Sequence, residues 1–155
     1  MPGAGKSYIG KKLAQNINYD FFDFDDYIEA TEGRKLQEIL DELGDEGFLE
    51  IEEKRVLEKL PMYRAVLSPG GSVVYNSKLM EEFRKCSKIV YLSQSLQTII
   101  SRLPKQRGGI VGLKNKGIEQ LFEERIILYE KYADYTVDCE DLELDEIIQK
   151  ILEII

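Results

Sequence analysis

The chain has 155 residues, a net charge of −8, no histidine, and two cysteines, Cys86 and Cys139, without paired spacing. This length predicts a single domain, 1–155, and the acidic balance argues against a nucleic-acid or anionic-membrane surface, because such surfaces carry clustered Lys and Arg. The lack of histidine excludes histidine catalysis and histidine metal ligation, and the cysteine spacing indicates neither a disulfide framework nor a zinc site.

The chain opens with Pro2-Gly3-Ala4-Gly5-Lys6-Ser7 and an amphipathic stretch, Tyr8–Asn16. This pattern predicts a phosphate-binding loop that leads into a helix, because glycines let consecutive amides point at phosphate oxygens and the helix N-terminus adds a positive dipole end. Lys6 would reach the β- and γ-phosphates, and the Ser7 hydroxyl would ligate Mg²⁺. The leading glycine of the full pattern G-x-x-x-x-G-K-[ST] would fall one place before Met1. The alternative is an ordinary glycine-rich turn that caps a helix.

Short strands and helices alternate along the rest of the chain. Strands are predicted at Tyr19–Phe24, Arg64–Ser68, Lys88–Leu92 and Tyr135–Asp138. One helix is predicted to begin at Tyr27, and others to cover Lys35–Leu43, Asp45–Leu60, Ser77–Arg84, Leu96–Leu103, Ile118–Ala133 and Leu144–Ile155, with Gly33 and Gly44 as breaks. This alternation predicts a parallel sheet covered on both faces, with ligands at the carboxyl ends of the strands.

Asp23 and Asp25 follow the first predicted strand, two residues apart. In an extended segment this spacing points both side chains the same way. Paired carboxylates beside a phosphate loop can hold a hydrated Mg²⁺ and orient a substrate hydroxyl, and we predict this role for both residues. The alternative is that Asp25 or Asp26 only caps the next helix.

Two further features point to ligand contacts. Gly70 and Gly71 follow the second predicted strand, where glycine lets the backbone come close to a ligand, although a plain turn is the alternative. Arg125 lies on the apolar stripe of the helix predicted at Ile118–Ala133. A buried charge must be paired, so Arg125 faces either a structural carboxylate or an anionic ligand, and we favour the ligand.

The segment Lys105–Lys116 holds four Lys or Arg residues and three glycines, and it predicts a mobile basic loop. Phosphoryl transfer depends on positioning and charge neutralisation, and a mobile arginine such as Arg107 can close over the γ-phosphate. Lys105 or Arg102 could take the same part. The alternative is a solvated loop charge.

These motifs together resemble the shikimate kinase family of small P-loop kinases. The matching residues are Pro2-Gly3-Ala4-Gly5-Lys6-Ser7, Phe22-Asp23-Phe24-Asp25, Ile28-Glu29, Gly33, Gly44-Asp45-Glu46, Phe48, Glu52, Gly70-Gly71, Arg107, Arg125, Tyr129 and Ala133-Asp134. Their order and spacing hold across nearly the whole chain. The resemblance implies an α/β, P-loop NTPase-like fold with three α/β/α layers and five parallel strands in the order 2-3-1-4-5. It also implies a substrate-binding subregion at about 25–60 and a lid at about 104–117.

The resemblance further implies ATP and Mg²⁺ as cofactors, and it assigns a role to each motif. The nucleotide site would comprise Gly3, Ala4, Gly5, Lys6, Ser7, Tyr8, Arg102 near adenine, and Arg107 on the phosphates. Ser7 and Asp23 would hold Mg²⁺. Asp25 would contact the accepting hydroxyl, while Gly70, Gly71 and Arg125 would line an acid substrate. Lys6, Asp25 and Arg107 are then the expected catalytic residues.

The sequence departs from the family pattern in three places. The first strand and first glycine are absent, and we expect a truncated or misplaced start rather than a working four-stranded variant. Leu49 stands where the family has an arginine that grips the substrate carboxylate, and its stripe with Val56 and Leu60 predicts that it joins the core. Losing that guanidinium would cost about 1.5–3 kcal/mol of binding. Finally, Ser72 replaces a third glycine, and the lid lacks a usual proline.

The sequence therefore predicts an ATP- and Mg²⁺-dependent kinase that phosphorylates a hydroxyl of a small polar metabolite, with shikimate as the first expectation. The alternatives are a related kinase whose acceptor carries one anionic group or none, and a nucleotide-binding module without catalysis. We expect a monomer that binds neither nucleic acid nor membranes. Because no apolar run approaches about 18 residues and no signal peptide is visible, we expect a cytoplasmic protein.

Overall fold

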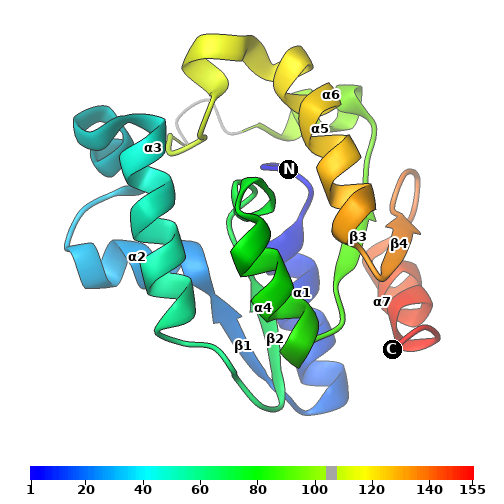
Figure 1. The fold of residues 1–155 in the computed structure, drawn as a ribbon. Helices are drawn as coiled ribbons and strands as arrows, with labels where there is room; N and C mark the ends of the chain where they lie inside the picture. Colours follow the sequence, from blue (N-terminus) through cyan, green and yellow to red (C-terminus); the bar gives the residue numbers. More distant parts are fainter. Residues whose placement is uncertain (104–107) are drawn as a thin grey trace.

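The structure is a computed structural model that describes residues 1–103 and 108–155. Its four strands form two parallel pairs (Figure 1). Strand β1 (Asp20–Asp23) pairs with β2 (Ala65–Ser68), and β3 (Val90–Ser93) pairs with β4 (Tyr135–Asp138). Within the described residues no strand joins β2 to β3. If these strands are numbered 2, 3, 4 and 5 in the expected order 2-3-1-4-5, the described residues form no strand at the central place of that order.

Helices connect and cover these strands. They are α1 (Lys6–Ile17), α2 (Phe24–Glu32), α3 (Leu36–Leu57), α4 (Ser77–Cys86), α5 (Leu96–Arg102), α6 (Leu113–Tyr132) and α7 (Leu144–Leu152), with a short 3₁₀ helix, η1 (Val73–Tyr75). In the described part of the chain, none of these helices combines the length and the apolar character that a membrane crossing needs.

Several helix boundaries differ from the sequence-based expectation. Helix α2 begins at Phe24 instead of Tyr27, because the Asp23 side chain accepts a hydrogen bond from the Asp25 amide and caps the helix early. Helix α6 begins at Leu113, so residues 113–116 of the predicted basic loop are helical. Helix α7 ends at Leu152 instead of Ile155.

The break expected at Gly44 is confirmed as a kink. Residues Leu36–Leu57 form one helix interrupted where Gly44 adopts φ 69° and ψ −176°. A positive φ of this kind favours glycine, because a Cβ atom would be strained there. Helix α6 bends at Gly117 (φ 73°, ψ 168°) for the same reason. Gly44 lies within the predicted substrate-binding subregion, and Gly117 lies at the end of the predicted lid.

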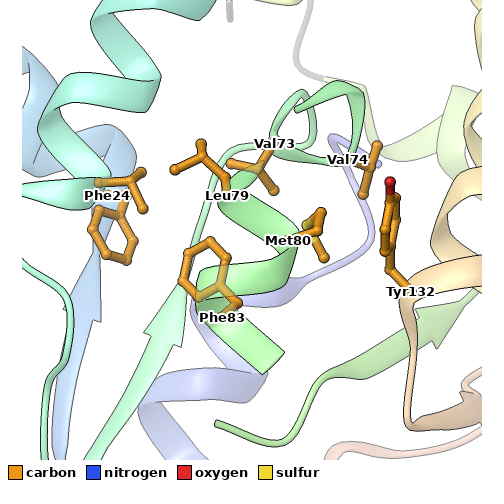
Figure 2. Packing of buried hydrophobic residues seen from close by; sticks show 8 residues of the cluster. Phe24, Val73, Val74, Leu79, Met80, Phe83 and Tyr132 are labelled. Carbon is orange, nitrogen blue, oxygen red and sulfur yellow. The ribbon is translucent and has the colours of Figure 1, made fainter. Parts of the chain in front are cut away.

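The core consists of several hydrophobic clusters that fix the loops above them. In the cluster of Figure 2, side chains from α2, η1, α4 and α6 converge on one another: Phe24, Val73, Val74, Leu79, Met80, Phe83 and Tyr132. A second cluster packs Ile9 and Leu13 of α1 against Ile147, Ile148 and Ile151 of α7. A third joins α2 and the first half of α3 to Val111. The start of the chain is held by a small cluster of Met1, Ala4 and Ile99.

Candidate active site

A cavity of about 310 Å³ lies where the opening loop, the start of α2, the turn after β2 and α6 meet. Ten of the predicted site residues line it, namely Gly3, Gly5, Lys6, Ser7, Tyr8, Asp25, Gly70, Gly71, Arg102 and Arg125. Ala4, within the loop, is buried against Met1 and Ile99, and Asp23 is linked to the cavity through Ser7. Arg107, the predicted lid arginine, lies outside the described residues. The structure thus brings segments that are far apart in the chain to one place.

The opening loop has the backbone geometry of an anion-binding turn. Gly3 (φ 81°) and Gly5 (φ 85°) are both left-handed, and a Cβ atom on Gly3 would lie 3.2 Å from the Ile99 carbonyl oxygen. Helix α1 begins directly at Lys6, with no side-chain cap and no acidic residue in its first turn. The positive end of its dipole is therefore not neutralised by its own side chains, and the loop fits a polyphosphate.

Ser7 and Asp23 meet at the edge of this loop. The Ser7 hydroxyl donates to Asp23 Oδ2 at 2.6 Å, while Asp23 Oδ1 accepts the Asp25 amide at 3.0 Å. The expectation of an extended Asp23–Asp25 pair was wrong, because Asp25 already belongs to the first turn of α2. The capping residue is Asp23, not Asp25 or Asp26.

Oxygen donors such as the Ser7 hydroxyl and the Asp23 carboxylate suit Mg²⁺. Among the described residues there is no group of three or more His, Cys, Asp or Glu side chains that could hold a metal ion by itself. These donors therefore fit an ion that takes its other ligands from phosphate oxygens and water, as Mg²⁺ does at nucleotide sites.

Gly70 and Gly71 are both closely packed, Gly70 the more tightly of the two. A Cβ atom on Gly70 would lie 2.5 Å from Glu52 Oε1 and 2.9 Å from Asp25 Oδ1. On Gly71 it would lie 3.0 Å from Arg125 Nη1 and 3.1 Å from the Tyr129 hydroxyl. The turn after β2 therefore runs between two carboxylates on one side and a guanidinium on the other.

Arg125 is buried, with only 2% of its surface exposed. Its Nη2 donates to the Val111 carbonyl at 2.9 Å, and its Nε donates to the Tyr75 hydroxyl at 3.3 Å. The guanidinium also lies 5.2 Å from the centre of the Tyr75 ring. Within the described residues no carboxylate forms an ion pair with it. A buried guanidinium that borders a cavity without a carboxylate partner attracts an anionic ligand.

Tyr129 completes this corner of the cavity. Its hydroxyl donates to the Gly71 carbonyl at 2.9 Å, and its ring stacks on Tyr91 with centres 5.2 Å apart. Burial raises the pKa of Tyr129 to about 12, so the hydroxyl keeps its proton and remains a donor to the turn.

Glu52 is a site feature to which the sequence analysis gave no role. Only 1% of its surface is exposed, its Oε1 accepts from the Ser72 hydroxyl at 2.8 Å, and its Oε2 has no hydrogen-bond partner within the described chain. Burial raises the pKa of Glu52 to about 7. The signal was present in the sequence, because Glu52 lies four residues from both Phe48 and Val56 on the buried face of α3.

Leu49 packs into the core, as expected. It contacts the cluster that contains Ile28, Ile39 and Phe48. Val56 and Leu60 belong to a different cluster, so the single stripe expected for the three residues is divided between two. The position that would carry an arginine in the family pattern is therefore filled by an apolar side chain.

Residues 108–116 lie against the first half of α3. The Gly109 amide donates to Gln37 Oε1 at 2.7 Å, and the Gly112 amide donates to Asp45 Oδ1 at 3.0 Å. Lys114 forms an ion pair with Asp41. The described part of the predicted lid is therefore docked on the predicted substrate-binding subregion.

Comparison with known proteins agrees with this architecture. The family described as shikimate kinase matches residues 2–155. The chain is 33% identical over 154 residues to the shikimate kinase of Thermodesulfovibrio yellowstonii, covering 97% of this chain and 88% of that protein. It is 34% identical over 156 residues to the shikimate kinase of Dictyoglomus turgidum, covering 97% and 91%. The chain belongs to the shikimate kinase family.

Solved structures of shikimate kinases share its fold. The Acinetobacter baumannii shikimate kinase in complex with shikimate superposes with a TM-score of 0.89 at 26% identity, covering 98% of this chain and 87% of that chain. The Bacteroides thetaiotaomicron shikimate kinase superposes with a TM-score of 0.78 at 28% identity, covering 97% and 92%. The expected family, the α/β P-loop fold class and the enzyme class of an ATP-dependent phosphotransferase are confirmed.

Proposed function

We propose that this protein transfers the γ-phosphoryl group of ATP to the 3-hydroxyl of shikimate, forming shikimate 3-phosphate and ADP. The observation that carries the proposal is the shared cavity of about 310 Å³, which Lys6 and Ser7 line from the phosphate loop and Asp25 and Arg125 line from the acceptor side. A donor and an acceptor bound in one cavity can react without diffusing apart, which lowers the barrier to transfer.

The nucleotide half uses the opening loop and α1. The left-handed Gly3 and Gly5 expose backbone amides to the β- and γ-phosphates, and the Lys6 ammonium neutralises their charge. Ser7 and Asp23 would hold Mg²⁺, which supplies further neutralisation of the phosphate oxygens when it is bound. Arg102 lines the same cavity and would flank the adenine. Arg107, which lies outside the described residues, is the arginine that would neutralise the γ-phosphate.

The acceptor half holds the hydroxyl and the carboxylate of shikimate. Asp25 orients the hydroxyl and takes its proton as the new oxygen–phosphorus bond forms and the bond to ADP breaks. Arg125 pairs with the shikimate carboxylate, and Gly70 and Gly71 provide the close backbone wall. Residues 25–60 act as the substrate-binding subregion, residues 104–117 act as a lid over the site, and the protein works as a monomer.

One observation favours a second candidate within the same enzyme class. Leu49 packs among apolar side chains where the family pattern has an arginine, so Arg125 is the guanidinium left for an acceptor carboxylate. A site with fewer cations suits an acceptor that carries one anionic group or none. This second candidate is a kinase for a related hydroxylated metabolite.

The test is ADP release in a coupled assay with ATP, Mg²⁺ and a panel of hydroxy acids and neutral polyols. Lys6→Ala should lower turnover at least ~100-fold, because transition-state charge on the phosphates loses its cation. Lys11→Ala, on the exposed side of the same helix, is the matched control and should keep wild-type turnover. Circular dichroism confirms that both variants fold.

The outcomes separate the candidates. Faster turnover of shikimate than of neutral acceptors supports shikimate kinase activity. A preference for neutral acceptors supports the second candidate. ATP binding without ADP release on any acceptor would leave a nucleotide-binding module, and wild-type activity in Lys6→Ala would remove the phosphate-loop assignment.

A further inference from the structure

Glu52 is the only buried carboxylate among the described residues. It comes from α3 and sits behind the turn after β2, where its Oε1 lies 2.5 Å from the position of a Gly70 Cβ atom. Asp25 Oδ1 lies 2.9 Å from that same position. Gly70 and Ser72 both line the cavity, and Ser72 donates to Glu52 Oε1 at 2.8 Å. Glu52 therefore lies directly behind the wall of the acceptor site.

The surroundings of Glu52 do not supply a cation in contact with it. No ion pair to Glu52 is formed within the described residues, and its Oε2 is buried without a hydrogen-bond donor there. Leu49, one helical turn earlier, points its side chain into an apolar cluster. Arg125 and Lys6 are close enough only for long-range attraction. The negative charge of an ionised Glu52 would therefore partly cancel the positive potential of Arg125 in the cavity.

We propose that Glu52, held by Ser72 behind Gly70, determines how well the acceptor site binds anions. As a neutral carboxylic acid it leaves the full attraction of Arg125 to an acceptor carboxylate, and as a carboxylate it repels that acceptor. The inference rests on the proposed function, because it concerns the acceptor side of the same cavity. Glu52 does not touch the reacting atoms, so its role is in positioning and selection.

Protonation of Glu52 changes within the ordinary working range of pH. Burial is the largest cause of its raised pKa, about 7, and nearby Asp25 raises it further. The Ser72 hydrogen bond lowers the pKa of Glu52, as do Arg125 and Lys6. The buried N-terminal amine also faces Lys6 and Arg125, and burial lowers its pKa. Below about pH 7 Glu52 is neutral, and above it the carboxylate weakens the binding of an anionic acceptor.

Direct binding of shikimate, measured by titration calorimetry without nucleotide, tests this inference. Between about pH 6 and pH 8, the dissociation constant of the wild type should rise roughly three- to tenfold, because one nearby like charge appears. Glu52→Gln is neutral at every pH and can still accept the Ser72 hydrogen bond, so its dissociation constant should stay flat. Glu50→Gln, an exposed glutamate of the same helix, is the matched control and should behave like the wild type.

Ser72→Ala gives a second reading that a purely structural role for Glu52 would not produce. Because the Ser72 hydrogen bond lowers the pKa of Glu52, its loss should move the midpoint of the pH dependence upward. Thermal melting followed by circular dichroism shows that each variant is folded. A pH dependence that survives unchanged in folded Glu52→Gln, or a midpoint that does not move in Ser72→Ala, overturns the inference alone. Absence of shikimate binding by the wild type at any pH overturns the proposed function as well.

Discussion

The side chain at position 49 contributes packing where the family pattern contributes charge. Leu49 belongs to the cluster of α2 and α3 that contains Ile28 and Phe48, and Phe48 itself lines the cavity. Position 49 is adjacent in sequence to Phe48, a residue of the cavity wall. Position 49 is therefore a place where charge could be returned to the acceptor site.

Leu49→Arg should strengthen shikimate binding about tenfold or more, because a charge-assisted hydrogen bond to the carboxylate contributes about 1.5–3 kcal/mol. Part of the folding stability is lost at the same time, since an apolar contact leaves the cluster. Calorimetric titration measures the affinity, and a thermal melt measures the stability. Leu49→Met, which keeps the volume and adds no charge, should leave affinity unchanged. A folded Leu49→Arg protein with no gain would show that the pocket has been rebuilt for another acceptor.

Individual residues were predictable to different degrees. Arg125 could be singled out because a charge on an apolar helical stripe conflicts with burial, and the structure finds it buried without a carboxylate partner in the described chain. Glu52 was named among the motif residues but given no role, because a glutamate among many on an acidic helix looks solvated. The structure finds it buried and bonded to Ser72 of the turn after β2. The Asp23–Asp25 geometry was wrong because capping ended the strand one residue earlier.

At the scale of elements, the kinked helix α3 and residues 108–116 form a connected pair. Asp45 lies just after the Gly44 kink, and its two carboxylate oxygens accept from the Gly112 amide at 3.0 Å and from the Asn115 side chain at 3.3 Å. The kink turns the helix so that this carboxylate meets the start of α6. The Asp45 side chain therefore connects α3 to Gly112, which lies 67 residues later in the sequence.

Asp45→Ala should speed amide hydrogen exchange in residues 108–116 by roughly 2- to 10-fold, because it removes acceptors whose hydrogen bonds contribute about 0.5–1.5 kcal/mol each. Mass spectrometry of the exchanged protein measures this directly. Glu46→Ala, an exposed neighbour, is the control and should leave exchange unchanged. Equal exchange in Asp45→Ala and the wild type would mean that other contacts hold this segment.

Element types were more predictable than element ends. The breaks at Gly33 and Gly44 followed from glycine alone, and both residues have positive φ angles. The helical turn at 113–116 was missed, because three glycines and four basic residues obscure any periodicity in that segment. The interaction of Gly109 and Gly112 with α3 is a long-range contact that a local pattern cannot reveal.

On the scale of the whole molecule, the fold places the residues that line the cavity on segments that are far apart in the chain. The loop at residues 2–8, the start of α2, the turn after β2 and α6 reach the same cavity only when the clusters beneath them are packed. Ligands that bind this cavity therefore stabilise the whole folded chain and not one local region.

Saturation with ATP and Mg²⁺ at about 100 times the dissociation constant should stabilise the folded state by about 2.7 kcal/mol and raise Tm by roughly 5–10 °C. Scanning calorimetry gives the shift. Adenosine, which lacks the phosphates, is the control ligand and should raise Tm much less, because the proposed function assigns phosphate binding to the loop and Lys6. Equal shifts with adenosine and ATP would place the binding energy outside the opening loop.

The overall topology followed from the sequence through the alternation of strands and helices together with the order of motifs. Composition could not reveal that β1 would pair only with β2 and β3 only with β4 among the described strands. Such pairing depends on whether another strand lies between β2 and β3. The four predicted strands were all found, each four residues long: β1, β2 and β3 are shorter than predicted, and β4 has the predicted bounds.

The tyrosines around Arg125 give this protein a built-in optical reporter. The chain has nine tyrosines and no tryptophan, so tyrosine dominates its near-ultraviolet absorption and emission. Tyr75 contacts the Arg125 guanidinium, and Tyr129 bonds to the Gly71 turn while stacking on Tyr91. An acceptor that settles against Arg125 changes the surroundings of these rings. Near-ultraviolet dichroism can therefore follow occupancy of the acceptor side without any label or coupling enzyme.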